Sequence, residues 1–466
     1  MILGGAYSEH FMIGSTTADS HSLKENLINW LRSSRQTGRA WSASSLFQQV
    51  VETYFTQILR VGLGLAMTIL VARILGPRGR GLYAVALAIG ALGVQLGNFG
   101  LGSSNIYYVS KSRNLLSVLL GNALLVSFLI GGGGVLALGI VFSIWTGLAP
   151  LHGMLLTLAL VAIPFCLAYY LMQSLLLGVL DIRGYNKIEI ANKVLAVALV
   201  VLLWGLKLIS VEWMLSGFVL AQIVTFVWIL RRVGFLAAPA KLAFSLQLLR
   251  EHVGLAFRAY LVLLFSFLVV RVDLLMVQYI LGAEQAGQYS IAASMADYVL
   301  MLPAVTANIL FPKLSGMRDM RDKMRLMKKA GIIIGLLVLP LIILSAVLAR
   351  PLVRLLFGAA YLPAAQAFIW LMPGIFFVAV ETVAVQFLNS LGYPASVVFT
   401  WLICTLVNVG LNLWLIPAYG IVGASINSSL TYILGSLLIF WIIFQTGRRT
   451  PVGGTATAPT EIVEAV

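Results

Sequence analysis

The chain has 466 residues, of which 60% are hydrophobic and only 10% are charged. A soluble domain carries about 25% charged residues, so this composition excludes a soluble globular protein and places the chain in a lipid bilayer. The formal net charge of +15 does not indicate nucleic-acid binding, because most basic residues fall in short segments between apolar runs, where they orient a chain in a membrane.

Apolar runs of about 20 residues or more recur along the chain, which is the length of a helix that crosses a bilayer. They lack the alternation over about 10 residues that is typical of barrel strands. We therefore predict an all-α polytopic membrane protein. The twelve predicted spans lie near residues 47–74, 82–109, 114–143, 152–180, 187–209, 211–231, 254–281, 287–311, 330–349, 364–391, 395–417 and 420–445.

Six spans fall in each half, and an even number gives both halves the same orientation, related by an axis along the membrane normal. We expect residues 1–45 to form a cytoplasmic segment that is a candidate interfacial helix, and 46–235 to form an N-lobe. Residues 236–446 should hold a linker helix, over 236–252, and a C-lobe, and 447–466 a disordered cytoplasmic tail. Segment 313–329, rich in Met and basic residues, should contact anionic headgroups.

The distribution of Lys and Arg predicts that both termini are cytoplasmic. Most basic residues outside the spans fall on the side of the membrane that holds the two termini, which is the pattern of cytoplasmic segments. The exceptions on the opposite side are Arg73, Arg78, Arg80, Lys207, Arg350 and Arg354.

One nine-residue signature occurs twice. The sequence LGPRGRGLY at 75–83 returns as LGAEQAGQY at 281–289, with the same Leu, Gly, Gly and Tyr in register. Each copy separates two long apolar runs. A repeat of this kind in a hydrophobic chain is the mark of a two-lobed transporter.

Polar side chains within the spans are the candidate site residues, because a charge at the membrane centre costs roughly 2.5–3.5 kcal/mol to insert. Span 1 has a polar stripe with Gln57 and Arg60, and span 2 has one with Gln95 and Asn98. The second half contributes Arg258, Arg271 and Asp273 on span 7, Asp297 on span 8 and Glu381 on span 10. The stripes predict either a cavity between the lobes or hydrogen bonds between helices.

Several of these charges have alternative structural roles. Glu189 and Lys193 are four residues apart, in the order that favours an ion pair. Arg271 could pair locally with Asp273, although residues two apart point about 200° away from each other on a helix. Asp297 and Glu381 have no partner evident in the sequence, which favours a role in a cavity or in proton binding.

Signatures of catalysis are absent from the sequence. It has no Walker loop, no acidic metal cluster and no His in the middle of a span, and its two Cys, Cys166 and Cys404, lie in apolar runs as small apolar side chains do. We therefore expect neither an enzyme nor a cofactor.

Four stretches carry a family resemblance: LVARILGP at 70–77 with Gly81 and Tyr83, Asp273 leading into Leu281 and Gly282, LNSLGYP at 388–394, and LIPAYGIVGA at 415–424. In this order, over roughly residues 47–445, the chain resembles the oligosaccharide flippases of polysaccharide biosynthesis. These belong to the multidrug/oligosaccharidyl-lipid/polysaccharide exporter superfamily.

The resemblance implies a V-shaped pair of six-helix lobes whose first two helices line a central cavity. It also implies flipping of an undecaprenyl-diphosphate-linked oligosaccharide across a bacterial inner membrane, with a polysaccharide polymerase as a candidate partner. Arg60, Arg258 and Arg271 would then attract the diphosphate, and Gln57, Gln95 and Asn98 would contact sugars. Asp273, Asp297 or Glu381 would bind a coupling proton or sodium ion.

Three other functions fit parts of the sequence. A drug/cation antiporter of the same superfamily would have an acidic cavity. A peptidoglycan-precursor flippase would complement a strain that lacks its own peptidoglycan-precursor flippase. A polytopic enzyme, such as a polysaccharide polymerase or acyltransferase, would need a catalytic cluster or a large extramembrane loop, and the predicted outer loops are no longer than about 15 residues.

Overall fold

The computed structural model describes residues 43–237 and 242–449. Within these ranges, all regular secondary structure is helical. The expected interfacial helix and the expected disordered tail lie almost wholly outside the described residues.

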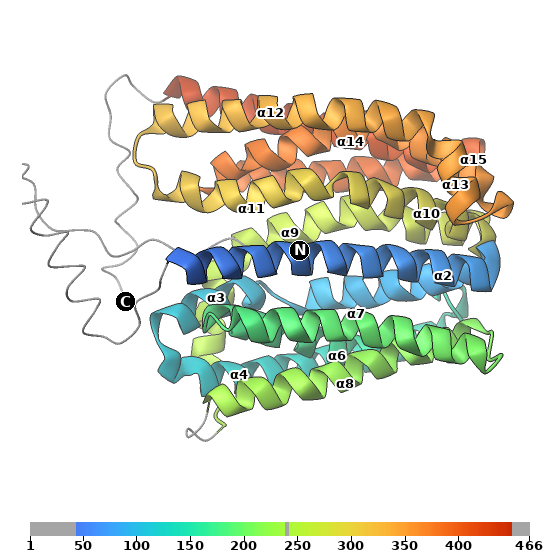
Figure 1. Ribbon diagram of the computed structural model, residues 1–466, viewed down its shortest axis with the longest axis horizontal. Helices are drawn as coiled ribbons and strands as arrows, with labels where there is room; N and C mark the ends of the chain where they lie inside the picture. Colours follow the sequence, from blue (N-terminus) through green and yellow to red (C-terminus); the bar gives the residue numbers. More distant parts are fainter. Residues whose placement is uncertain (1–42, 238–241, 450–466) are drawn as a thin grey trace, which may run out of the picture.

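The helices of the first half form one bundle, seen in the lower part of Figure 1. They are α2 (Ala43–Gly97), α3 (Leu101–Lys111), α4 (Leu116–Leu125), a π-helical turn (Val126–Gly131), α5 (Gly132–Ile144), α6 (Gly153–Gly178), α7 (Ile182–Gly205) and α8 (Val211–Ala237). Short 3-10 turns occur at Arg113–Leu115 and Thr146–Leu148.

The helices of the second half form the other bundle, in the upper part of Figure 1. They are α9 (Leu246–Leu281), α10 (Ala283–Val299), α11 (Met301–Gly316), α12 (Met320–Val347), α13 (Ala349–Leu356), α14 (Leu362–Asn389) and α15 (Ala395–Arg449), with a 3-10 turn at Ala359–Tyr361.

The prediction of about twelve spans is confirmed once two long helices are divided at their breaks. Among the described residues, nine helices are long and apolar enough to cross a membrane, and α10 with α11 forms a tenth span bent by 43°. Two of the nine, α2 and α15, each contain a non-helical glycine, Gly76 and Gly420. Both halves of each broken helix are long enough to cross, which brings the total to twelve.

The repeated signature has the same backbone in both lobes. Gly76 has φ 66° and ψ −179°, and Gly282 has φ 86° and ψ 179°. This region is accessible essentially only to glycine. The repeat therefore encodes one sharp reversal between the first and second span of each lobe.

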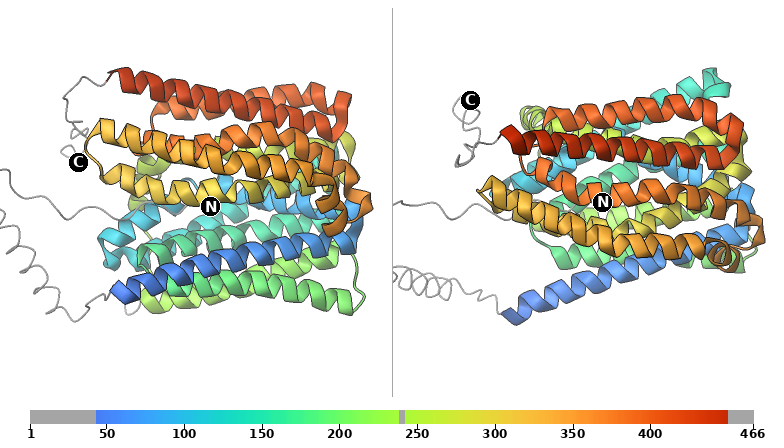
Figure 2. Two further views of the ribbon diagram at one scale, coloured as in Figure 1. Left: turned by 45° about the horizontal axis from the view of Figure 1, so that its top comes forward. Right: turned by 90° about the horizontal axis from the view of Figure 1, so that it is seen from above.

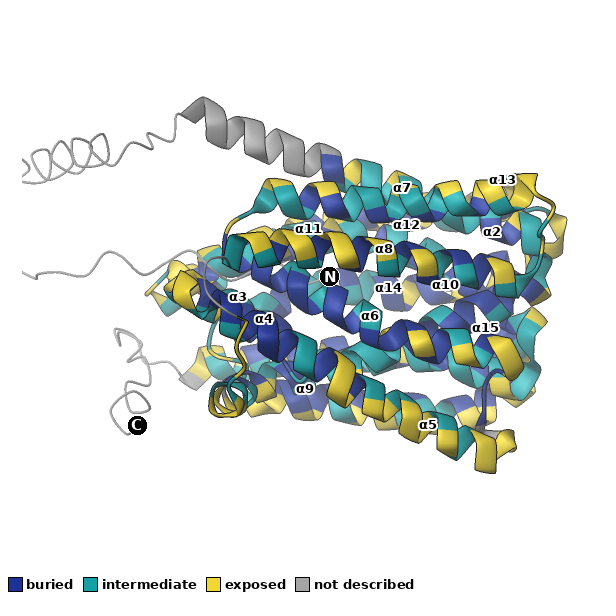
Figure 3. Cartoon of the chain, turned by 90° about the horizontal axis from the view of Figure 1, so that it is seen from below, coloured by how far each residue is buried: buried dark blue, intermediate teal, exposed yellow. Residues whose placement is uncertain are grey.

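Large apolar residues are exposed over much of the surface. Figure 3 shows exposed positions along α5 and α8 on one side of the molecule. Leu136 on α5 is 70% exposed and Leu336 on α12 is 69% exposed, whereas Asn408 and Ser428 are fully buried. A protein in water would not leave so much apolar surface uncovered. The arrangement fits a bundle whose solvent is lipid.

The connection between the lobes differs from the predicted linker helix. Residues 242–245 are not helical, and α9 begins at Leu246 and continues without interruption into the seventh span. Ser245 ends the extended stretch because its hydroxyl accepts a hydrogen bond from the Leu248 amide, and Asn122 exchanges two hydrogen bonds with the Ser245 backbone. A side chain of the first lobe thus holds Ser245, the residue before α9, in an extended conformation.

Segment 313–329 is also not one continuous helix. It breaks between Gly316, the last residue of α11, and Met320, the first of α12, and the Asp319 carboxylate caps the new helix by accepting from the Arg321 amide. Consequently α11 and α12 run antiparallel, as Figure 1 and the left view in Figure 2 show.

Candidate functional site

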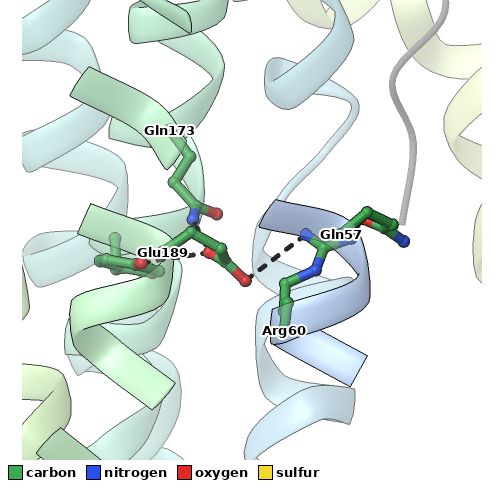
Figure 4. Close-up of polar contacts among 5 residues, drawn as sticks. Gln57, Arg60, Gln173 and Glu189 are labelled. Atoms are coloured by element: carbon green, nitrogen blue, oxygen red, sulfur yellow. Dashed lines mark hydrogen bonds and ion pairs between the residues drawn. The ribbon is translucent and has the colours of Figure 1, made fainter. Parts of the chain in front are cut away.

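The first half holds a charged cluster between α2, α6 and α7 (Figure 4). Arg60 Nη1 lies 3.6 Å from Glu189 Oε1, and Arg60 also donates to the Gln57 side chain. Glu189 in turn accepts hydrogen bonds from the Tyr169 hydroxyl, at 3.2 Å, and from the Gln173 amide. Two predicted substrate contacts, Gln57 and Arg60, therefore lie together.

The expected Glu189–Lys193 pair is wrong. Glu189 is paired with Arg60, and no ion pair within the described ranges includes Lys193. An i,i+4 pair on a helix is worth only about 0.2–0.5 kcal/mol. Glu189 instead gains the Arg60 guanidinium and two hydrogen bonds from α6, which together stabilise it more than a local pair with Lys193 would.

The second half holds a matching ion pair between α9 and α10. Arg271 Nη2 lies 2.8 Å from Asp297 Oδ2, and the two side chains are 38% and 41% exposed. The local pairing of Arg271 with Asp273 is wrong because the two side chains leave α9 in different directions. Asp297, which has no partner in the sequence pattern, has one in space.

The arginines are therefore not the uncompensated cations that we expected for a diphosphate site. Arg60 and Arg271 each lie beside one carboxylate, so each pair is electrically neutral. Arg258 is exposed, and the described part of the chain offers it neither an ion pair nor a hydrogen bond.

Two of the predicted amide contacts have different surroundings. Asn98 is 2% exposed, and its Oδ1 accepts from the Gly102 amide at 2.9 Å across the break between α2 and α3. That bond makes it a structural cap. Gln95, one turn earlier on α2, is half-buried and keeps its amide free of any partner within the described ranges.

Asp273 lies at the centre of a fully buried polar cluster. It accepts from Asn412 Nδ2 at 2.7 Å, from the Tyr289 hydroxyl at 3.1 Å, and from the Ser428 hydroxyl. None of the ion pairs in the described structure includes Asp273, which is 0% exposed. A buried carboxylate without a cationic partner is costly unless a proton or a bound cation neutralises it.

The hydrogen bonds of Ser428 are compatible with a proton on Asp273. The Ser428 hydroxyl has one hydrogen but lies within bonding distance of both Asp273 and the Ala424 carbonyl, at 2.8 Å. A proton on Asp273 Oδ2 would let Asp273 donate to Ser428 and Ser428 donate to Ala424. Asn412 bonds to Asp273 through its Nδ2, and its Oδ1 is buried without a hydrogen-bond partner.

Sequence reasoning found Asp273 but missed its partners. Asn408 and Asn412 are four apart on the eleventh span, and their side chains bond to each other at 3.1 Å, so this pair of amides was a signal that could have been used. Ser428 carried no such signal. Glu381 on α14 is 3% exposed, and its Oε1 is buried without a partner.

The described residues contain no group of three or more His, Cys, Asp or Glu placed to hold a metal ion.

The two bundles meet closely at the end that contains Gly76, which we call the Gly76 end. A Cβ added to Gly81 would lie 1.7 Å from the Ala283 carbonyl oxygen, and one added to Gly287 would lie 1.9 Å from the Pro77 carbonyl oxygen. These reciprocal contacts use the second of the two glycines that the copies share, Gly81 in the first and Gly287 in the second. Beside them, the Tyr361 hydroxyl donates to the Ala72 carbonyl at 2.9 Å, and Arg73 donates to backbone carbonyls of α13.

Toward the opposite end, the bundles also touch through α9. The Tyr260 hydroxyl donates to the Leu96 carbonyl at 3.1 Å, and the His252 ring stacks on Tyr108 with centroids 3.8 Å apart. The ion pairs of Arg60 and Arg271 lie along helices α2, α9 and α10, which make most of the contact between the bundles.

Curated relatives match parts of the chain. A putative O-antigen transporter of Shigella flexneri is 26% identical over 171 residues, which is 36% of this chain and 41% of that protein. A probable flippase, AglR, of Haloferax volcanii is 26% identical over 173 residues, which is 36% of each. The chain thus spans less than half the length of these relatives.

Solved structures share the fold over most of the chain. A lipid II flippase, MurJ, in an inward closed conformation has a TM-score of 0.67 at 16% identity, covering 85% of this chain and 87% of that one. An inward-facing multidrug resistance MATE family transporter of the MOP superfamily has a TM-score of 0.64 at 16% identity, covering 86% and 98%. These likenesses confirm the predicted two-lobed fold.

A family model described as polysaccharide biosynthesis protein matches residues 70–366. Since the match covers more than half of the 466 residues, and since the sequence motifs and the fold agree with it, this multi-pass membrane protein belongs to the polysaccharide biosynthesis protein family, with the architecture of the MOP superfamily.

Proposed function

We propose that this protein is a flippase that moves a lipid-linked oligosaccharide, carried on undecaprenyl diphosphate, across the bacterial inner membrane by alternating access. Family membership and the names of the O-antigen transporter and the flippase support a transporter of this class rather than an enzyme. The excess of Lys and Arg on one side supports cytoplasmic termini.

One observation carries the proposal: two neutral ion pairs lie within the spans, one in each lobe. Arg60, Arg271 and Asp297 are on α2, α9 and α10, which contact the other lobe. Arg271 and Asp297 are more than a third exposed. Exposure to acyl chains would be costly for such charges, which supports a wet space between the lobes. The tight glycine contacts at the Gly76 end would then close that space on the outer side.

In this mechanism the diphosphate replaces a carboxylate at the arginines. Arg60 is the more open to exchange, because its 3.6 Å contact with Glu189 is long for a hydrogen-bonded pair. A diphosphate carries more charge than one carboxylate and accepts paired hydrogen bonds from a guanidinium. Arg258 would supply a cation that needs no exchange, Gln57 and Gln95 would contact sugars, and the lipid tail would stay in the bilayer.

We propose the buried Asp273 cluster as the site of a coupling proton or sodium ion, ahead of Glu381 and of Asp297. Asp297 already has Arg271 as a partner, and Glu381 lacks the surrounding oxygens that Asp273 has. We also retain the division into an N-lobe (46–235) and a C-lobe (236–446), and a polysaccharide polymerase as a candidate partner in the membrane.

The experiment that tests the function is depletion of the protein in its own cell, followed by mass spectrometry of extracted lipids. Accumulation of one undecaprenyl-diphosphate oligosaccharide, with loss of the matching surface glycan, is the expected result. Accumulation of lipid II would identify a peptidoglycan-precursor flippase. A change in drug or cation efflux, with normal lipid-linked sugars, would identify an antiporter.

A further inference from the structure

A large pocket opens between α12, α14 and α15, at the end of the bundle opposite Gly76. Its volume is about 840 Å³, within the roughly 300–1,000 Å³ typical of ligand pockets. The helices that form it lie in the second lobe, on the side away from the first lobe in Figure 1. None of the residues that line the pocket belongs to the ion pairs of Arg60 and Arg271, so the pocket is separate from them.

The rim of the pocket is basic. Four cations line it, Arg321, Arg325, Lys328 and Arg448, and no carboxylate does. Arg325 is bonded to the exposed Asp322 at 3.0 Å. Within the described ranges no carboxylate pairs with the other three, so the rim has a surplus of positive charge.

The wall of the pocket is apolar. Met324, Ile332, Phe440 and Phe444 contribute to it, and Gly447 lines it without a side chain. Along α12 the lining changes from Arg321 and Lys328 near the helix start to Ile332 deeper in the span. Along α15 it changes from Arg448 near the helix end to Phe440, and the Arg448 guanidinium lies over the Phe444 ring, 4.2 Å from its centroid.

We propose that this pocket binds an anionic phospholipid of the surrounding bilayer. Charge at the membrane surface with apolar lining at depth matches a phosphate headgroup joined to an acyl chain, and clusters of Lys and Arg at a span end attract anionic lipids. A soluble phosphate would fill only the basic rim. Binding of a protein partner or of a second copy of the chain would not require basic residues at the membrane surface and apolar residues at membrane depth.

Native mass spectrometry of the purified full chain tests the proposal. The protein is incubated with phosphatidylglycerol or with phosphatidylcholine of identical acyl chains, and retained lipid is measured. We expect phosphatidylglycerol to be retained preferentially. Combining Arg321→Gln, Lys328→Gln and Arg448→Gln should reduce its retention by about tenfold or more, since each cation near a membrane surface contributes about 1 kcal/mol of attraction.

Two further variants separate charge from shape. Combining Lys313→Gln, Arg318→Gln and Lys329→Gln removes three cations at the same end that do not line the pocket, and should leave retention within about twofold. Gly447→Phe keeps every charge but fills the apolar part, where a Cβ would already lie 3.0 Å from the Met324 side chain. It should reduce retention of both lipids.

Three results would overturn the proposal. One is equal loss of phosphatidylglycerol in the control triple variant, which would mean a general charge effect. Another is displacement of the lipid by inorganic phosphate alone, which would mean a soluble-anion site. The third is a dimer that the pocket variants dissociate without any change in retained lipid, which would assign this face to a second copy of the chain.

Discussion

Arg60 and Arg271 show why a charge inside a membrane must be judged with its neighbours. The guanidinium of each residue is compensated by one carboxylate, and a partly exposed pair of this kind contributes little net stability, about 0–1 kcal/mol. A pair that is cheap to break can exchange its carboxylate for a phosphate group. The pairs therefore favour reversible binding over a permanent cationic site.

Replacing both arginines tests this exchange. Arg60→Ala with Arg271→Ala should lower surface glycan about tenfold or more at normal protein levels, because charge-assisted hydrogen bonds contribute about 1.5–3 kcal/mol each. Surface glycan is measured by gel or lectin staining, and protein by immunoblot. Arg318→Ala, at an exposed position outside the spans, is the control. Unchanged glycan in the double variant would reject the assigned roles.

His252 predicts a response to acid. It is 1% exposed, and its Nε2 has no hydrogen-bond partner. Burial lowers the pKa of His252 from 6.5 to about 4, although the neighbouring Glu251 acts to raise it. As the pH falls, the unfolded chain takes up this proton first. The stability that neutral His252 gives is thus complete above pH 6.5 and declines as the pH falls toward about 4.

The test compares thermal unfolding of the detergent-solubilised protein at about pH 7 and about pH 5. His252→Phe keeps a ring to stack on Tyr108 but cannot be protonated, so it should lose less stability at the lower pH than the natural chain. His152→Phe, at an exposed position before α6, should behave as the natural chain does. Equal acid sensitivity of all three proteins would contradict the assignment.

At the scale of elements, hydropathy was enough to place the spans, because a membrane requires long apolar helices whatever their partners are. Hydropathy could not show that α2 and α15 bend at a single glycine without leaving a loop, or that Asn122 holds the Ser245 backbone extended before α9. Those details depend on contacts between distant segments. The pairing of Glu189 with Arg60 was hidden for the same reason, since the residues are far apart in sequence.

The repeated glycines of α2 and α10 give a prediction about these two elements. Gly81→Ala would place a methyl group against the Ala283 carbonyl, which is rigid backbone. The helices must then separate at the Gly76 end, which favours the state open at that end. Spin labels at Trp213 and Arg350, after Cys166→Ala and Cys404→Ala, should report a longer distance between the lobes.

Gly90→Ala is the matched control in the same helix, because a Cβ at Gly90 meets no atom within 4 Å. It should leave the distance between the labels unchanged. Gly287→Ala should reproduce the effect of Gly81→Ala, since the two contacts are reciprocal. Should Gly81→Ala leave the distance unchanged while Gly90→Ala alters it, the close glycine contact would not be what holds the lobes together.

For the molecule as a whole, a cation at Asp273 can drive transport only if it binds one arrangement of the lobes more tightly than the other. Asp273 is connected to the second half of the repeat, because the Tyr289 hydroxyl bonds to it and Tyr289 lies two residues after Gly287. Neutralising Asp273 therefore acts on the helix that forms the contact between the lobes. This connection offers a physical route from the cation to the Gly76 end.

The last prediction follows from that route. With the same two spin labels, the distribution of distances in the natural chain should shift when either sodium is added or the pH is lowered, whichever ion is coupled. Asp273→Asn keeps the shape and most hydrogen bonds but cannot bind either ion as a charge, so its distribution should not respond. Asp322→Asn removes an exposed carboxylate at the other end of the lobe and should respond normally. If Asp273→Asn still responds and Glu381→Gln does not, the buried carboxyl of α14 is the coupling site, because it is the other carboxyl buried without a cation.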